Sequence, residues 1–242
     1  MSSKWIDYTD EDQPLRGYWV EPHSPGRRAT VIVVHTFRGL TASIQGRAVR
    51  LAEAGYAVFA LDVFGPDVRP ADHGTALATI KPFQQDRALF RRRLAAGFEV
   101  ARAQPGCDPR RVAAIGYCFG GSAVLEMARA GLPLVGVVSL HGELATPMKA
   151  ERGVISAKVL ALHGDADVVV EQEQVLAFQD EMRAADADWE LVTYAGAKHS
   201  FTGEGSGPDS DPTAAFDAQA ETRSWARQMH FLAEVLQAEG AK

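Results

Sequence analysis

The sequence predicts an α/β fold with a mostly parallel central sheet and helices on both faces, organised as a single domain over residues 1–242. Two observations support this prediction. Apolar runs of strand length alternate with longer segments in which apolar residues recur at helical spacing. Such alternation is typical of a parallel sheet, because crossover helices join its strands. A length of 242 residues with 46% hydrophobic content is also sufficient for a sizeable core.

The first elements follow from the local pattern. Arg28–Thr36 is rich in β-branched residues and is predicted to form a buried strand. Ala42–Gly55 has apolar residues at helical spacing and ends at a glycine, which predicts a helix. Tyr56–Gly65 is a second strand-like run, and residues 80–103 are predicted to form one long helix. The stretch between them, Gly65–Thr79, is expected to be irregular.

The same alternation continues toward the C-terminus. Further strands are predicted at residues 111–117, 133–142, 157–167 and 188–196, and helices at 121–131, 171–185 and 214–238. The segment Thr202–Thr213 is rich in Gly, Ser, Asp and Pro and is expected to be a mobile surface loop. It follows a predicted strand, as does Gly65–Thr79, and ligands of open α/β sheets lie beyond the carboxyl ends of the strands. Either segment is therefore expected to shape a pocket.

Composition and charge exclude several classes of function. The formal net charge of −6, from 25 basic and 31 acidic residues, does not favour a general affinity for nucleic acid or for an anionic membrane. The basic cluster at residues 91–93 is interpreted as the solvated face of a helix. The polar N-terminus does not resemble a signal peptide, and no apolar run approaches the roughly 18 residues of a membrane-spanning helix. We therefore expect a soluble, cytoplasmic protein, whose oligomeric state the sequence does not predict.

Cysteine and histidine usage bounds the chemistry further. Two cysteines cannot build a disulfide framework, and no Cys/His spacing matches a zinc site. Cys107 lies in the turn-like segment PGCDPRR and is assigned no role. Neither a metal nor another cofactor is therefore expected.

The second cysteine lies in a pattern that indicates a catalytic nucleophile. Cys118 is the centre of GYCFG, residues 116–120, between a predicted strand and a predicted helix, which matches a nucleophile elbow with Cys in place of Ser. At such a turn the central residue has a strained backbone, and its neighbours two before and two after pass too close to other backbone to carry side chains. The adjacent helix N-terminus favours a thiolate. The structural alternative is a buried cysteine in a glycine-rich turn.

A nucleophile of this kind needs a base and a group that orients the base. In α/β-hydrolases the chain order is nucleophile, acid, histidine. Downstream of Cys118, a strand-end segment carries Asp165 and Asp167, and the loop after the last predicted strand carries His199. We predict Asp167 as the orienting acid, with Asp165 as the second choice. The alternatives are that an aspartate caps a turn or helix, and that His199 is an ordinary surface-loop histidine.

Two backbone amides are expected to stabilise an oxyanion. The first belongs to Phe119, directly after the nucleophile, and the second to Phe37, in the loop HTFRGL after the strand VIVVH. His35 ends that strand, and we interpret it as structural rather than as a general base.

These segments resemble the dienelactone hydrolase family of α/β-hydrolases. GYCFGG around Cys118 is the most specific match, HGDADVVV is similar to the segment with the family's catalytic aspartate, and AKHSFTG is similar to its histidine loop. VIVVHTFRGL and GYAVFALDVFG are similar to the oxyanion strand with its loop and to the following strand. The similarity extends over residues 31–201. It implies the α/β-hydrolase fold and a triad of Cys118, His199 and Asp167.

The resemblance also implies metal-free hydrolysis of a small-molecule ester or lactone through an acyl-cysteine intermediate. Family members that open dienelactones hold the substrate carboxylate with arginines, and here the substrate-binding candidates are Arg87, Arg38 and Thr36. Two features depart from the family. HSFTGEG contains no arginine after the histidine, and Thr36 stands where many members have a glutamate that holds the resting thiol. Thr36 cannot accept a proton at neutral pH, so we expect Cys118 and His199 to rest as a thiolate–imidazolium pair.

Other functions remain open at the level of sequence. The chain is alternatively a general carboxylesterase or thioesterase, or a peptidase, since the fold carries many chemistries. A non-catalytic member of the fold that binds a small ligand or a partner is a further alternative. Redox use of the thiol is disfavoured because no second cysteine is placed to resolve it.

Overall fold

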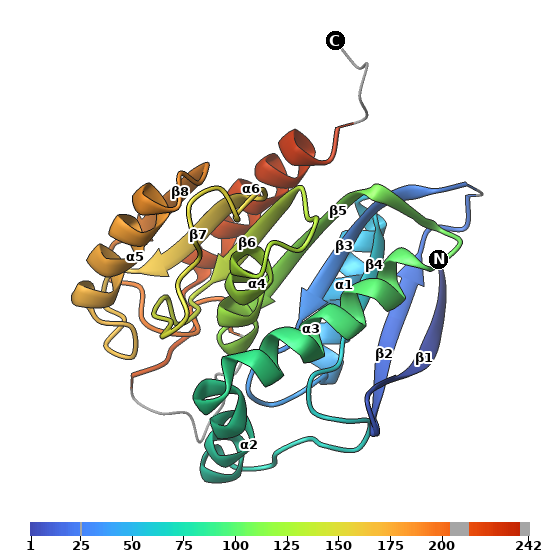
Figure 1. The fold of residues 1–242 in the computed structure, drawn as a ribbon, viewed down its shortest axis with the longest axis horizontal. Coiled ribbons are helices and arrows are strands. Elements are labelled where there is room, and N and C mark those ends of the chain that lie inside the picture. The colour runs from blue at the N-terminus through green and yellow to red at the C-terminus, as the bar shows by residue number, and fades with distance from the viewer. Residues whose placement is uncertain (25, 204–212, 238–242) are drawn as a thin grey trace.

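The computed structural model describes residues 1–24, 26–203 and 213–237, and its strands form one eight-stranded sheet in the order β1-β2-β4-β3-β5-β6-β7-β8 (Figure 1). The strands are β1 (Ser2–Asp10), β2 (Gln13–Glu21), β3 (Arg28–Val34), β4 (Ala57–Leu61), β5 (Cys107–Tyr117), β6 (Gly136–Leu140), β7 (Lys158–Gly164) and β8 (Trp189–Tyr194). The helices are α1 (Ala42–Glu53), α2 (His73–Gln85), α3 (Arg87–Arg102), α4 (Phe119–Arg129), α5 (Gln172–Ala184) and α6 (Ala218–Val235). Pairing is parallel from β4 through β8 in the sheet, which confirms the predicted α/β-hydrolase fold.

Helices cover both faces of the sheet, as expected. Alternate residues of β3 illustrate the two cores: Ile32 and Val34 pack into the cluster that includes residues of α3, α4 and α5, whereas Val31 and Val33 pack into the cluster of α1 and α6. Figure 1 shows α1 and α6 behind the sheet and α3, α4 and α5 in front of it. Burial on both faces explains why the parallel strands read as continuous apolar runs. None of the described helices combines the length and the apolar character needed to cross a bilayer.

The N-terminal hairpin β1–β2 is not among the elements predicted from the sequence. β1 pairs along its whole length with β2, and β2 pairs antiparallel with β4. Most side chains of β1 are exposed because it is the edge strand of the sheet. An exposed edge strand carries few apolar residues, so it lacks the periodic signal by which the buried strands are recognised.

The prediction of one long helix over residues 80–103 is wrong. Two helices meet at Asp86, whose backbone is extended (φ −124°, ψ 93°) and whose side chain accepts a hydrogen bond from the amide of Leu89. Asp86 therefore ends α2 and caps α3, a role that aspartate favours. α2 also begins earlier than expected, at His73, where Asp72 caps it, so the second part of Gly65–Thr79 is helical rather than irregular.

The C-terminal predictions are met in part. The closing helix runs from Ala218 to Val235 rather than from 214 to 238, and residue 238 lies outside the described residues. Most of the predicted loop Thr202–Thr213 also lies outside them, since residues 204–212 are not described.

Candidate active site

Three predicted site residues meet at the carboxyl ends of the parallel strands. Cys118 follows β5, Asp167 follows β7, and His199 follows β8. His199 Nε2 lies 3.3 Å from Cys118 Sγ, and His199 Nδ1 lies 2.8 Å from Asp167 Oδ2. The imidazole of His199 thus contacts the thiol through one ring nitrogen and the carboxylate through the other. This edge of the sheet is where ligands of open α/β folds bind.

The backbone around Cys118 is a sharp turn of the kind predicted. Cys118 has φ 54° and ψ −116°, a left-handed value that costs energy for any residue except glycine. A side chain on Gly116 would lie 1.8 Å from the carbonyl oxygen of Gly120, and one on Gly120 would lie 2.2 Å from that of Val34. Both glycines are therefore required by close backbone approach, and the turn aims the thiol away from the sheet.

Asp167 rather than Asp165 contacts the histidine. Asp167 is buried, and its Oδ1 accepts hydrogen bonds from the amides of Val169 and Val170 at 2.9 and 3.0 Å, which leaves Oδ2 for His199. Asp165 is exposed and accepts only a long 3.5 Å bond from the amide of Gly196 among the described contacts. The two backbone bonds fix the orientation of the Asp167 carboxylate.

The partners of His199 favour its charged form. Burial acts against protonation, but the negative charge of a Cys118 thiolate and the hydrogen bonds to Asp167 and Cys118 outweigh it and raise the pKa of His199 to about 10. Both ring nitrogens face acceptors, so the geometry suits an imidazolium that donates in both directions. The carbonyl of His199 accepts the amide of Ala215 at 3.0 Å, which anchors the loop.

His141, directly after β6, is a site residue that the sequence analysis missed. Its Nδ1 accepts a hydrogen bond from the Cys118 amide at 3.2 Å, and its Nε2 donates to Thr202 Oγ1, 2.8 Å away. Burial, followed by the positive charge of His199, holds the pKa of His141 well below its usual value. A neutral imidazole therefore supports the elbow from behind. It is the second-last residue of the strand predicted over residues 133–142, and this strand-end position is the signal that could have identified it.

A cavity of about 310 Å³ opens beside the thiol. The lining surface is mostly apolar, and it includes side chains of the oxyanion loop, α2 and the loops after β7 and β8. The predicted residues Phe37, Phe119 and Arg87 lie on its wall, whereas Thr36 and Arg38 are not among the described residues that line it. A few polar groups in an apolar concavity are typical of a small-molecule site.

The two predicted oxyanion amides are free to act as donors. Within the described part of the chain, neither the amide of Phe37 nor that of Phe119 donates a hydrogen bond to another protein group. Phe119 is the first residue of α4, where amides have no partner within the helix. Both residues border the cavity next to Cys118.

Thr36 and Arg38, predicted to bind substrate, instead form hydrogen bonds with the protein backbone. The Thr36 hydroxyl accepts a hydrogen bond from the amide of Arg38 at 3.2 Å, which tightens the loop that carries Phe37. The Arg38 guanidinium donates to the carbonyl of Ala71 at 2.8 Å. Arg87 alone of the three substrate-binding candidates is on the wall of the cavity.

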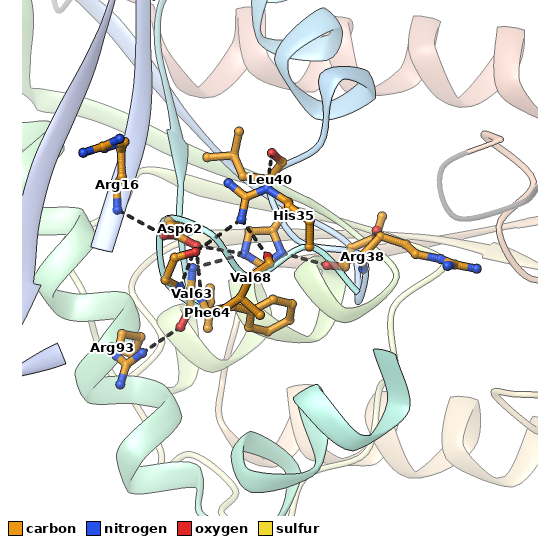
Figure 2. Close-up of polar contacts among 12 residues, drawn as sticks. Arg16, His35, Arg38, Leu40, Asp62, Val63, Phe64, Val68 and Arg93 are labelled. Carbon is orange, nitrogen blue, oxygen red and sulfur yellow. Dashed lines mark hydrogen bonds and ion pairs between the residues drawn. The ribbon is translucent and has the colours of Figure 1, made fainter. Parts of the chain in front are cut away.

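His35 lies in a separate buried cluster behind the oxyanion loop (Figure 2). Its Nδ1 donates to the carbonyl of Thr36 at 2.7 Å, and its Nε2 accepts from the amide of Val63 at 3.1 Å. Burial lowers the pKa of His35 to about 4, an effect that the carboxylate of Asp62 opposes only in part. With both nitrogens bound to backbone groups, His35 ties β3 to the segment after β4, which agrees with its structural interpretation.

Comparison with known proteins gives one consistent family. The model of the dienelactone hydrolase family matches residues 15–236. A solved dienelactone hydrolase-like promiscuous phosphotriesterase from metagenomic libraries is 37% identical, with a TM-score of 0.93 over 98% of this chain and 99% of its own. The structure named m3DLH is 32% identical, with a TM-score of 0.92 over the same shares. A protein of Salmonella typhimurium named provisionally as a carboxymethylenebutenolidase is 27% identical over 93% of this chain and 83% of its own.

Proposed function

Since the chain belongs to the dienelactone hydrolase family, hydrolases that act on lactone and ester bonds, we propose that it cleaves such a bond in a small molecule with Cys118 as the nucleophile. The observation that carries the proposal is the continuous series of contacts from Asp167 through His199 to the Cys118 sulfur. A nucleophile, a base and an orienting acid within hydrogen-bond reach are the minimum arrangement for covalent acyl transfer.

The first half of the reaction forms an acyl-enzyme. The Cys118 thiolate attacks the carbonyl carbon, and the amides of Phe37 and Phe119 donate to the oxygen as it becomes negative. Loss of one such donor typically costs about 3–4 kcal/mol of transition-state stabilisation. When the tetrahedral intermediate collapses, the His199 imidazolium gives its proton to the leaving alcohol or enol oxygen, and a thioester to Cys118 remains.

The second half hydrolyses the thioester. His199, now neutral, takes a proton from water, and the resulting hydroxide attacks the thioester carbonyl in the same oxyanion site. Collapse of this intermediate releases the carboxylic acid and restores the thiolate–imidazolium pair. Asp167 stabilises the imidazolium in both halves and keeps Nε2 directed at the reacting atoms.

Mass spectrometry of the intact protein tests the acyl-cysteine. Wild-type protein mixed with an activated aryl ester should gain the mass of one acyl group at Cys118, and Cys118→Ala should lose both the adduct and turnover. The matched control is Cys107→Ala, which removes the other, buried cysteine and should keep both. Full activity in Cys118→Ala would end the proposal.

The resting ion pair is tested separately by the pH dependence of alkylation. Thr36 supplies no carboxylate to hold a neutral thiol, and His199 Nε2 lies 3.3 Å from the Cys118 sulfur, close enough to form an ion pair with a thiolate. We expect the rate at which iodoacetamide modifies Cys118 to change little between about pH 6 and 9. A steep rise with a midpoint near ~8.5, the value of a free thiol, would refute the pair but leave the hydrolase proposal standing.

Phosphotriester hydrolysis is a second candidate activity. The solved structure with a TM-score of 0.93 is described as a promiscuous phosphotriesterase, and the apolar cavity beside Cys118 suits an uncharged triester. Thiolate attack at phosphorus would expel an alcohol or phenol and leave a phosphorylated cysteine that water must cleave. Release of a chromogenic phenol from a neutral aryl phosphotriester by wild type, but not by Cys118→Ala, would establish it.

A further inference from the structure

The wall of the cavity contains a buried cation that is poorly paired. The Arg87 side chain is 6% exposed, and its Nε is buried with no hydrogen-bond partner among the described residues. Its two terminal nitrogens make only long contacts of 3.4 Å, one to the carbonyl of Phe83 and one to Glu143 Oε2. A guanidinium has five donors, so most of its capacity is unused. A buried charge in this state favours an anionic neighbour.

That neighbour is Glu143, and the chain holds it in place from both sides. The preceding residues continue from β6 through His141, which is bound to the elbow amide. The following residue, Leu144, accepts a 2.7 Å hydrogen bond from the buried Arg129 guanidinium through its carbonyl. The Glu143 backbone is therefore fixed, and its partly exposed side chain lines the cavity next to Arg87, with Oε2 3.4 Å from the guanidinium.

The rest of the cavity contributes little charge. Among the described residues that line it, Arg87 and Glu143 are the charged pair outside the reacting Cys118 and His199, and His73 is the remaining titratable group. Most of the other lining side chains are apolar, including Leu77, Val169 and Val170. Among the described lining residues, the cavity wall beyond Cys118 and His199 thus carries one cation and one anion, 3.4 Å apart, whose formal charges sum to zero.

We propose that Glu143 is a specificity-determining residue that selects uncharged acyl groups and disfavours substrates with a carboxylate. The inference rests on the proposed function and adds a substrate class to it. A substrate carboxylate that approached Arg87 would also approach the Glu143 carboxylate, and like charges brought together at a binding surface are strongly unfavourable. A neutral ester or lactone can bind beside Arg87 and Glu143 and against the apolar wall without this repulsion.

Two isosteric esters test the proposal. 4-Nitrophenyl pentanoate and the mono-4-nitrophenyl ester of glutaric acid differ only in a terminal methyl or carboxylate group. Wild type should prefer the pentanoate, and Glu143→Gln should raise the ratio of kcat/KM for the glutarate ester over the pentanoate by about tenfold or more, mainly through KM. Glu151→Gln makes the same charge change at an exposed position of the same loop and should leave the ratio at its wild-type value. An unchanged ratio in Glu143→Gln would overturn the proposal.

Binding separates failure of this proposal from failure of the proposed function. In a Cys118→Ala background, which cannot form an acyl-enzyme, the affinities for pentanamide and for the monoamide of glutaric acid can be compared by ligand-observed NMR. Glu143→Gln should tighten binding of the anionic amide by a similar factor and improve binding of the neutral one less. Equal changes for both ligands would refute the role of Glu143 whether or not Cys118 is the nucleophile. Conversely, if Glu143→Gln tightens binding of the anionic amide as expected but protein with Cys118 intact hydrolyses neither ester, the result would count against the proposed function alone.

Discussion

Two buried histidines at strand ends, His35 and His199, have pKa values shifted in opposite directions although each has an aspartate nearby. His199 lies 2.8 Å from Asp167 and has its pKa raised to about 10. His35 lies 3.9 Å from Asp62 and has its pKa lowered to about 4. Both side chains are largely removed from solvent. Burial alone therefore does not decide whether the imidazole carries a proton.

The difference lies in what each ring nitrogen contacts. Around His199 both nitrogens face acceptors, a carboxylate and a thiol, so the ring is stabilised when both carry hydrogen. Around His35 one nitrogen donates to a carbonyl and the other accepts an amide hydrogen, which only the neutral ring can satisfy. The Asp62 oxygens are already bound to backbone amides, including those of Arg16 and Phe64. The hydrogen-bond partners of a strand-end histidine therefore determine whether it is suited to act as a base or as a neutral structural residue.

The largest effect is expected from Asp167→Asn. The side-chain oxygen of the introduced asparagine would keep the bonds from the amides of Val169 and Val170, which turns its NH₂ group toward His199 Nδ1. Nδ1 must then accept, the ring proton moves to Nε2, and the ring cannot take a proton from the thiol. We expect kcat/KM for an ester to fall by about 10³–10⁴, as for the comparable change in a serine triad. A loss below about tenfold, in protein with an unchanged fold by circular dichroism, would show that Asp167 does not orient the base.

The second prediction uses pH to separate the two histidines. Since His35 has a pKa of about 4 when folded and about 6.5 when unfolded, the unfolded chain binds more protons between these values. Its contribution to the free energy of unfolding is present above about pH 6.5 and is lost as the pH falls to about 4, by up to ~3 kcal/mol. His199 has the opposite sign: its contribution is present below about pH 6.5 and is lost as the pH rises through about 10.

Denaturant unfolding of wild type and His35→Gln at several pH values measures the first of these contributions. Gln does not titrate, so the difference between the two free energies of unfolding should grow as the pH rises from about 4 to about 6.5 and then remain level. Parallel curves for the two proteins over this range would contradict a neutral His35.

The third prediction concerns Asp62, in the buried cluster around His35. In Asp62→Asn, one of the backbone amides that now point at the carboxylate would face an NH₂ group, so at least one buried bond to a charged acceptor is lost. We expect about 2 kcal/mol less stability, seen as a Tm lower by roughly 4–8 °C. Because Asp62 lies behind the oxyanion loop and outside the cavity lining, kcat/KM of the folded protein should stay near the wild-type value. A loss of activity comparable to that of Asp167→Asn would show that the two clusters are functionally coupled.

Much of this architecture can be predicted from the sequence because it depends on local spacing. The glycines around Cys118 form a short motif at fixed spacing, although Gly120 is required by its close approach to Val34, and the buried strands are marked by continuous apolar runs. Cys118, Asp167 and His199 each follow a strand, and a parallel sheet brings the carboxyl ends of its strands to one edge. The structure brings these three side chains together as expected, and their roles in catalysis remain a proposal.

The features that the sequence did not predict depend on packing between distant segments. The partners of His141 and Glu143 come from segments far away in the chain, so no local sequence pattern predicts these contacts. Thr36 is among the predicted substrate-binding residues, but its hydroxyl accepts the amide of Arg38 within its own loop. The break at Asp86 interrupts a helical pattern on both sides, and it is recognised in the structure by the extended backbone of Asp86 and its capping bond to Leu89. In each of these examples the outcome depends on the hydrogen-bond partner of the side chain, which the sequence does not show.

The smallest effect is expected at His141, another buried histidine at a strand end. One of its nitrogens accepts the Cys118 amide and the other donates to Thr202, so by the same reasoning it is a neutral brace, although its ring lies 5.4 Å from that of His199. His141→Phe preserves a ring in this space but removes both bonds, and the Cys118 amide keeps only its 3.0 Å bond to the Leu140 carbonyl. We expect kcat/KM to fall about tenfold, equivalent to ~1.4 kcal/mol, through looser placement of the thiol. Nitrogen-15 NMR should find hydrogen on both nitrogens of His199 but only on Nε2 of His141. A doubly protonated His141 near neutral pH would break the rule that partner type sets the charge of these rings.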